Sequence, residues 1–486
     1  MPLILGTNSI KDATYNVANS VRFNHGEDGY LSRTASSGSY GTTYTISFWF
    51  KNTHPTAANE QYIYMGGDQN TSNNLWIRLN GSSRTLYLRT RTSGSNDCVL
   101  ITNRVFRDHS AWYHVVYEID TTQGTASNRV KLYINGVQET SFGTETYPDQ
   151  NDTFKIATSG KNQDIGRRTD GSSYNNFGLM LAEFCLIDGT ALDKDSFGEF
   201  DEDSPLIWKP KSVSGLTFGT NGFYLDFEDS SALGNDVSGN NNDFSSSGLA
   251  ATDQSTDTCT NNYITLNPIN ADLSNSTLTE GNLQFAGGDT SVNYDYVAAT
   301  IAPSAGKWYW EVKAVDNAEI DQVGVAKSDL AFFSNASNSN GLQATTYGGK
   351  AVQFSNGNKA GDGSQSSFMG GFSANNILMV ALDLDNGNIY FGRNGQWADG
   401  SGNADEAFGD ATAAFTNLTV GDAYVPAHNM RNNGGSNAGE SEYNFGSPPY
   451  ANSSSVADAN GYGAFEYTPP SGYLSLCTKN LGSDGG

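Results

Sequence analysis

Apolar and polar residues alternate with a period of two along much of this chain, and the clearest example lies between residues 306 and 326. The apolar positions that share one face of this stretch are Trp308, Trp310, Val312 and Ala314. The positions between them, which we expect to face solvent, are Lys307, Tyr309, Glu311 and Lys313. This period is typical of a half-buried antiparallel strand. Because two tryptophans on one face need an apolar layer to pack against, we expect a second sheet over this one.

Further strands are predicted along the whole chain. Short alternating segments separated by turns rich in Asn, Gly and Ser lie at 45–50, 62–65, 75–79, 85–89 and 112–119. Residues 179–187 are apolar at nearly every position, which is typical of a strand buried on both faces. Asn135-Gly136 and Asn386-Gly387 each follow a strand pattern and predict tight hairpin turns. The sequence therefore predicts an all-β protein with two antiparallel β-sandwich or jelly-roll domains in tandem.

Composition agrees with this fold class and restricts the partners. Only 16% of the 486 residues are charged, 12% are aromatic and 54 are glycine, as expected for strands joined by turns. A formal net charge of −25 without a cluster of Lys or Arg disfavours nucleic acid and anionic membranes as partners. No segment approaches the roughly 20 apolar residues of a membrane-spanning helix, and the N-terminus has no signal-peptide pattern. We therefore expect synthesis in a cytoplasm and no membrane insertion.

The first half of the chain carries a series of sequence blocks that resembles a known family. The blocks are SVRFN with YLSRT, TISFWFK, WYHVVYEID, KLYINGV, IGRR and LAEFCLIDGTAL. Together they resemble a laminin-G-like, concanavalin-A-type jelly roll. The segments 195–211, 222–244 and 253–268 resemble parts of structural proteins of tailed bacteriophages, in which Pro more often stands at the place of Cys259.

The second half of the chain resembles a SPRY domain. The strand with paired tryptophans, the hairpin LDLDNGNIYF and the late motif NFG occupy the places that the SPRY pattern expects. The final segment, GYGAFEYTPPSGYLSLCTKNL, resembles the C-terminal part of phage proteins that carry this domain. We therefore predict a laminin-G-like domain at 1–228, a linker rich in Ser, Asn and Asp at 229–275, a SPRY-like domain at 276–450 and a C-terminal tail at 451–486.

No pattern in the sequence indicates a catalytic or metal centre. The five histidines lie outside known metalloprotease and hydrolase motifs, and the four cysteines are too far apart to form a metal or redox motif. We interpret the cysteines as buried free thiols. The acidic pair Asp383 and Asp385 suits glycoside hydrolysis in principle, but contacts within the hairpin explain the same residues. We expect no enzymatic activity and no cofactor.

Binding groups in a β-sandwich are expected in its loops. The candidates in the first domain are Asp68, Asn70, Arg167, Arg168, Asp170 and Tyr174. Such side chains suit sugar hydroxyls, and oxygen-rich loops also suit Ca²⁺, although turn residues that bond to their own backbone give the same pattern. SPRY modules bind ligands through one surface built from loops, and the candidates there are Tyr347, Lys350, Arg393 and Trp397. Trp397 either lies exposed in its loop or closes the end of the core.

These resemblances imply a non-catalytic virion protein on the exterior of a tail or capsid. The favoured function is a tail-fibre or receptor-binding subunit that recognises host surface glycan. One alternative is a head fibre or capsid decoration protein, and another is an enzyme that degrades polysaccharide. The expected partners are other virion proteins and the host glycan. We expect a homo-oligomer, with a trimer as the favoured form.

Overall fold

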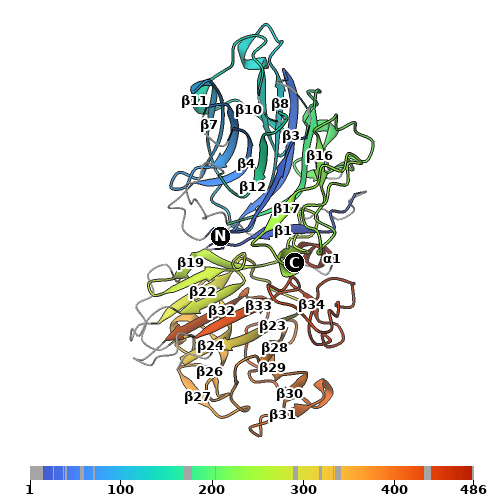
Figure 1. Cartoon of the computed structure of the whole chain (residues 1–486). Helices are drawn as coiled ribbons and strands as arrows, with labels where there is room; N and C mark the ends of the chain where they lie inside the picture. The colour runs from blue at the N-terminus through green and yellow to red at the C-terminus, as the bar shows by residue number, and fades with distance from the viewer. Residues whose placement is uncertain are drawn as a thin grey trace. The chain divides into compact units, whose positions relative to one another are not determined.

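We describe a computed structural model of the chain. It describes residues 15–483 except for gaps at 26, 37, 39–40, 55–59, 69–71, 155, 157, 169–177, 203, 288–293, 317–319, 332, 334–340 and 432–438. The chain divides into two compact units, Asp12–Asn261 and the part from Asn262 onward, which we call the first and the second domain. Both consist mainly of antiparallel strands (Figure 1), so the prediction of an all-β fold with two sandwiches in tandem is confirmed.

The first domain contains two eight-stranded sheets and a separate hairpin. The first sheet consists, in spatial order, of β10 (Val137–Glu139), β9 (Val130–Ile134), β8 (Trp112–Asp120), β3 (Thr43–Asn52), β13 (Leu179–Asp188), β1 (Ser20–Phe23) and β18 (Gln254–Ser255), with β16 (Phe223–Leu225) paired to β13. The second consists of β11 (Phe142–Thr146), β7 (Ser95–Val105), β6 (Thr85–Thr92), β5 (Asn74–Leu79), β4 (Gln61–Gly67), β12 (Asn162–Ile165), β2 (Tyr30–Thr34) and β17 (Ser245–Ser247). The hairpin pairs β14 (Gly198–Phe200) with β15 (Trp208–Pro210). Short 3-10 helices are η2 (Ala126–Asn128), η3 (Lys194–Ser196) and η4 (Ala251–Asp253).

Apolar side chains from the facing sides of these two sheets form the core of the first domain. Strand β13 is buried on both faces for nearly its whole length, as its continuous apolar sequence predicts. Phe184 of this strand stacks on Phe48 of β3 with ring centroids 5.2 Å apart. Asn135 and Gly136 both take positive φ, at 47° and 75°, which confirms the tight turn between β9 and β10.

Residues 229–261, which the sequence suggests are part of a linker, belong to the first domain. Strand β17 adds to the edge of one sheet by pairing with β2, and β18 adds to the other by pairing with β1. Phe244 is buried and packs edge to face on Phe223, with ring centroids 4.8 Å apart. The segment is poor in apolar residues, but Leu233 and Phe244 enter the core and its backbone completes two sheets, so it is held in place.

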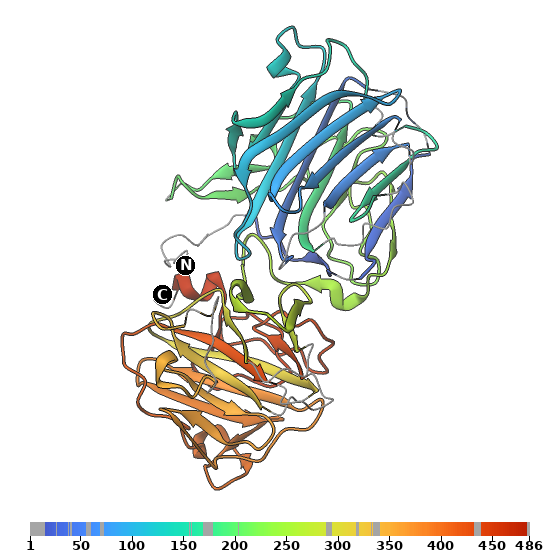
Figure 2. The ribbon, with the colours of Figure 1, turned by 90° about the vertical axis from the view of Figure 1, so that its left-hand side faces the viewer.

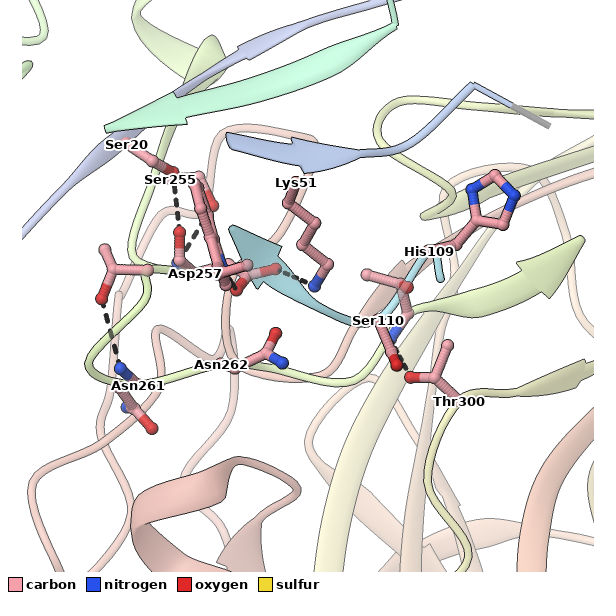
Figure 3. Close-up of polar contacts among 12 residues, drawn as sticks. Ser20, Lys51, His109, Ser110, Ser255, Asp257, Asn261, Asn262 and Thr300 are labelled. Atoms are coloured by element: carbon pink, nitrogen blue, oxygen red, sulfur yellow. Dashed lines mark hydrogen bonds and ion pairs between the residues drawn. The ribbon is translucent and has the colours of Figure 1, made fainter. Parts of the chain in front are cut away.

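A buried ion pair also attaches this segment to the first sheet (Figure 3). The ammonium group of Lys51 on β3 lies 2.7 Å from a carboxylate oxygen of Asp257, and both side chains are almost fully buried. The other oxygen of Asp257 accepts a hydrogen bond of 3.1 Å from Trp112 Nε1. The hydroxyl of Ser20 donates to the backbone carbonyl of Asp257 at 2.7 Å. Removing one partner of a buried ion pair leaves an uncompensated buried charge, which strongly destabilises the fold. This ion pair therefore stabilises the attachment of residues 229–261 to the first sheet.

The second domain also contains two large sheets. The seven-stranded sheet consists of β19 (Leu266–Asp272), β22 (Asp295–Ala299), β32 (Tyr424–Arg431), β24 (Ile320–Lys327), β25 (Lys350–Gln353), β26 (Lys359–Gly361) and β27 (Ser364–Ser366). The nine-stranded sheet consists of β20 (Ser276–Thr279), β21 (Gln284–Gly287), β33 (Glu440–Asn444), β23 (Lys307–Asp316), β28 (Ile377–Asp383), β29 (Asn388–Arg393), β30 (Gln396–Ala398) and β31 (Ala404–Glu406), with β34 (Leu474–Ser475) paired in parallel to β23. Short helices are η5 (Thr345–Tyr347), η6 (Phe408–Asp410) and α1 (Thr478–Ser483).

The alternating pattern of β23 correctly predicts the inner face of the second domain. Trp308 and Trp310 are almost completely buried in the core between the two sheets. Strands β28 and β29 form the expected hairpin, in which Asp383 accepts hydrogen bonds from the backbone and side-chain amides of Asn386. Asp385 accepts a bond of 2.7 Å from the backbone N–H of Gly306. These two carboxylates therefore support loop conformation, in agreement with the interpretation as hairpin contacts.

The outer face of β23 differs from the expectation, because Tyr309 and Glu311 are fully buried. The C-terminal segment covers them: Phe465 packs edge to face on Tyr309, and the backbone N–H groups of Glu466 and Tyr467 bond to Glu311. Residues 451–483, which the sequence suggests are a tail, thus complete the second domain. A strand pattern cannot indicate that a distant segment will cover its polar face.

Candidate functional site

The predicted loop residues of the first domain that the structure describes are held by contacts within the fold. Asp68 forms an ion pair with Lys161 and accepts a hydrogen bond of 2.7 Å from the side chain of Asn73. Arg167 pairs with Asp164 at 3.0 Å and lies over the ring of Tyr30. The other candidates of these loops, Asn70, Asp170 and Tyr174, lie outside the described residues. The contacts of Asp68 agree with the alternative that it stabilises its own turn.

The predicted residues of the second domain do not form an exposed surface. Tyr347 is buried and packs against Tyr296 and Phe333. The ammonium group of Lys350 forms an ion pair with Asp362. Trp397 is only 4% exposed and contacts Phe408.

Trp397 therefore fills a layer on the outer side of the nine-stranded sheet, together with Tyr309 and Phe465, and the idea that it is exposed is wrong. Arg393, at the end of β29, donates to the backbone carbonyl of Gly371. Lys350 belongs to the seven-stranded sheet, whereas Trp397 belongs to the nine-stranded sheet. The SPRY resemblance correctly indicates the strands, whereas three of the four candidate residues drawn from it, Tyr347, Lys350 and Trp397, are buried.

A group of side chains that sequence analysis missed lies on the outer face of the second sheet of the first domain, the sheet seen face-on in Figure 2. Strand register places Trp76 of β5 opposite Arg89 of β6, and Arg78 of β5 opposite Tyr87 of β6. Tyr62 of β4 lies opposite Arg78 on the other side. Aromatic rings and guanidinium groups therefore alternate across three neighbouring strands. With Arg91 and Arg168, we call these residues the arginine–aromatic face.

The guanidinium groups of this face stack on its rings. The Cζ atom of Arg89 lies 3.4 Å from the centroid of the Trp76 ring, and that of Arg168 lies 4.6 Å from the same ring. Arg78 lies 4.2 Å from the ring of Tyr87 and donates a hydrogen bond of 3.0 Å to the hydroxyl of Tyr62. Trp76 and Tyr62 are 3% and 1% exposed. The aromatic rings are therefore covered by guanidinium groups, of which that of Arg89 is itself buried and those of Arg78 and Arg168 are half-buried.

Several N–H groups of this face have no acceptor. Among the residues that the structure describes, none accepts a hydrogen bond from Trp76 Nε1, Arg78 Nε or Arg89 Nε. Burial lowers the pKa of Arg89 to about 10, and the positive charges of Arg91 and Arg78 contribute to this effect. The face therefore combines buried N–H groups that have no acceptor among the described residues with several arginines in a protein whose net charge is −25.

The signal for this face is present in the sequence. In NLWIRL and TLYLRTR the core positions are leucine and isoleucine, and the alternate positions carry Trp, Tyr and Arg where a solvated strand usually carries small polar residues. The candidate residues drawn from the sequence lie in loops, whereas most of this face lies on strands. Of the earlier candidates, only Arg168 lies on this face.

A metal site has little support among the described residues. One group of three carboxylates, on Asp399, Asp405 and Glu406, has oxygens within 4.8 Å of one another. Hydrogen bonds from Ser401 lower the pKa of Asp399, which shows that its carboxylate already serves the turn. Exposed acidic groups of this kind are common without an ion, so the cluster alone indicates no function.

Histidine, carboxylate and hydroxyl side chains of the kind that act as acids and bases in enzymes lie close together in this structure, but they are buried. His428 bonds to the carboxylate of Asp321 and lies 2.8 Å from the hydroxyl of Tyr443, and all three side chains are buried between the sheets of the second domain. Desolvation raises the pKa of Glu183 and of Glu311 to about 7. Substrate has no access to these groups in this structure.

Comparisons with known proteins agree with this fold. A family model described as the concanavalin A-like lectin/glucanases superfamily matches residues 25–176, and the SPRY domain model matches residues 307–437. The prediction of these two domain types is therefore confirmed. A search of curated protein sequences gives no match.

Several solved structures are similar to part of this chain. The SPRY domain of human HERC1 is 16% identical over 36% of this chain and 96% of its own, with a TM-score of 0.27. A heptameric SAP-like pentraxin from Limulus polyphemus is 18% identical over 37% of this chain and 80% of its own, with a TM-score of 0.27. Stonustoxin is 18% identical over 37% of this chain and 27% of its own, with a TM-score of 0.28.

Proposed function

We propose that this chain is a non-catalytic bacteriophage virion surface protein, a tail-fibre or receptor-binding subunit that recognises host surface glycan. The observation that carries the recognition role is the arginine–aromatic face. Its side chains project from three paired strands, which hold them at fixed spacing. Guanidinium groups are well suited to bind oxygen-rich ligands through paired hydrogen bonds. The virion setting is supported by the resemblance of residues 195–211 and of the C-terminal segment to phage structural proteins.

We propose a non-catalytic role because the two glutamates with strongly raised pKa values are buried. Glu183 and Glu311 have pKa values suited to acid–base chemistry, but each is covered by its own domain. Asp383 is engaged in a turn and in an ion pair with Lys307. A glycoside hydrolase instead needs two carboxylates that face the scissile bond.

A head fibre or capsid decoration protein is the second candidate. Within the part of the chain that the structure describes, α1 is the sole α-helix, and it has six residues. A coiled-coil shaft requires long helices with heptad repeats. The compact, strand-built form therefore suits a tip subunit or a decoration protein better than a shaft. No helix among the described residues is long and apolar enough to cross a membrane.

The test combines cell binding with localisation. Purified, fluorescently labelled protein should bind host cells, and surface polysaccharide extracted from the same cells should compete. The protein should release no reducing ends from that polysaccharide. A map of the intact particle with the chain on the capsid, together with absence of cell binding, would favour the decoration protein. Release of reducing ends that disappears on replacing one carboxylate would establish an enzyme.

We also propose that the subunit acts as a homo-oligomer, with a trimer as the expected form. Individual glycan sites bind weakly, and several linked copies raise the overall affinity without new contacts. Light scattering of the purified protein and the copy number in a particle map test this proposal. Isolated single copies on the particle would contradict it.

A further inference from the structure

We infer that Lys51 and Asp257 condense to an intramolecular isopeptide bond, which attaches residues 229–261 covalently to strand β3. The ion pair between these two side chains is the state from which the bond forms. Both reacting groups belong to the first domain, so folding of that domain is sufficient to bring them together. The bond is independent of the recognition role proposed above.

The two reacting groups are in direct contact inside the domain. The Nζ atom of Lys51 lies 2.7 Å from Oδ2 of Asp257, and the two side chains are 0% and 3% exposed. Figure 3 shows the lysine side chain extending from its strand to the carboxylate. Holding a nucleophile against its electrophile turns a reaction between two molecules into a step within one, at a very high effective concentration. Here the nucleophile is the amine, and the electrophile is the Cγ atom that carries Oδ2.

Apolar side chains surround the pair. Strand register places Lys51 between Trp112 of β8 and Met180 of β13. Both neighbours are buried and belong to one apolar cluster, which also contains Trp49 and Trp208. Charges are costly in such surroundings, and an amide in place of the ion pair removes both of them. Exclusion of water also protects the amide from hydrolysis.

Trp112 polarises the carboxyl group of Asp257. Its indole Nε1–H donates a hydrogen bond of 3.1 Å to Oδ1. This oxygen gains negative charge when the amine attacks Cγ, so the indole N–H stabilises the developing oxyanion. The backbone of Asp257 is held as well, because its N–H donates to Ser255 Oγ at 3.1 Å and its carbonyl accepts from the hydroxyl of Ser20 at 2.7 Å. The carboxyl group is therefore fixed in one orientation toward the amine.

The reaction balances without another reagent. A proton passes from the Lys51 ammonium group to Oδ2 of Asp257 along their hydrogen bond, which leaves a neutral amine and a neutral carboxylic acid. The lone pair of Nζ then forms the bond to Cγ, and one pair of the carbonyl double bond moves onto Oδ1. When this pair returns, the Cγ–Oδ2 bond breaks, and Oδ2 leaves as water with the proton it received and a second proton from Nζ. The products are one amide and one water, and no atom is oxidised or reduced.

Mass spectrometry of the full, denatured chain tests for the bond directly. After allowance for the initiator methionine, the mass should be lower than that of the sequence by one water molecule. Trypsin does not cleave after an acylated lysine, so the digest should contain the peptides around Lys51 and Asp257 as one linked species. Fragmentation of that species identifies the two joined residues.

Variants separate this bond from other losses of water. Lys51→Arg keeps the positive charge but removes the primary amine, so its mass should be that of its sequence. It should also migrate more slowly than the wild type on a denaturing gel, because the wild-type link closes a long loop in the chain. Lys307→Arg is the matched control and should retain the loss of water. Lys307 also pairs with an aspartate, Asp383, at 3.2 Å, but its side chain is 35% exposed and its ion pair is solvated.

Three results would overturn the inference. A wild-type mass equal to that of the sequence would show that the contact is an ion pair only. A loss of water that persists in Lys51→Arg would come from another reaction, such as cyclisation of an aspartate on its own backbone. A linked species that joins Lys51 to a residue other than Asp257 would contradict the assignment. The first and third results come from the wild type, so they stand even if Lys51→Arg fails to fold.

Discussion

Each domain buries one glutamate on the outer side of a central strand, and the two are held in different ways. Glu183 lies at an irregularity in β13 with a positive φ of 52°, and one of its carboxylate oxygens accepts bonds from the hydroxyls of Tyr15 and Tyr224. Glu311 of β23 uses both oxygens. It accepts bonds from the hydroxyl of Tyr309, the side-chain amide of Asn444 and two backbone N–H groups.

This difference shows what each glutamate contributes to its domain. The partners of Glu183 also bond to each other, since the hydroxyls of Tyr15 and Tyr224 lie 3.0 Å apart. Two of the partners of Glu311 are backbone N–H groups of the C-terminal segment, which lose this acceptor if the carboxylate is removed. Glu311 therefore attaches a distant segment to its sheet, whereas Glu183 completes a small side-chain network.

The largest expected effect is the loss of stability on replacing these carboxylates. Glu311→Ala removes the carboxylate that accepts four hydrogen bonds and should lower the free energy of unfolding of the second domain by about 4 kcal/mol. Glu183→Ala leaves two hydroxyls that can bond to each other and should cost the first domain about 2 kcal/mol. Urea unfolding followed by tryptophan fluorescence measures both values. Equal losses in the two variants would show that the number of partners does not distinguish the two sites.

A second expected effect concerns pH. Desolvation raises the pKa of both glutamates from 4.5 to about 7, so between these values the folded state keeps a proton that the unfolded state has lost. Each group therefore favours folding fully below about pH 4.5, and this contribution is lost as pH rises to about 7. A pKa shift of this size changes the free energy of unfolding by about 3 kcal/mol per group over this pH range.

Glutamine variants separate this pH effect by domain. Glu183→Gln should gain stability relative to the wild type as pH rises from 5 to 8, through the first domain, and Glu311→Gln should do so through the second. The measurement is the difference in unfolding free energy between variant and wild type at each pH. A difference that is independent of pH would show that the glutamate has an ordinary pKa.

The smallest expected effect is the removal of a single hydroxyl. Tyr309→Phe leaves Glu311 with three of its four partners and should cost about 1 kcal/mol. Tyr15→Phe halves the hydrogen bonds of Glu183 and should cost somewhat more, about 1.5 kcal/mol. Chemical unfolding at pH 8, where both carboxylates are ionised, gives the sharpest comparison. A larger loss of unfolding free energy for Tyr309→Phe than for Tyr15→Phe would contradict this expectation.

Much of the fold could be predicted because its signals are local. Trp308 and Trp310 face the core, Asn135-Gly136 turns a hairpin and β13 is buried on both faces, each as the pattern indicates. Both domain types were also predicted. The exposure of the candidate site residues was not predictable in this way, since Tyr347 and Trp397 are buried, and the arginine–aromatic face lies on strands that yielded no candidates.

The sequence by itself determined the strands, their inner faces and the two tandem sandwiches, because a period of two depends on neighbouring residues alone. Tertiary structure decided which outer faces become buried. Residues 229–261 are poor in apolar side chains, yet Phe244 packs into the first domain, and Phe465 of the C-terminal segment packs into the second. Asp257 and Glu311 bind across long stretches of chain. Such contacts depend on where the chain returns after many residues, and a local pattern of apolar and polar positions contains no information about that return.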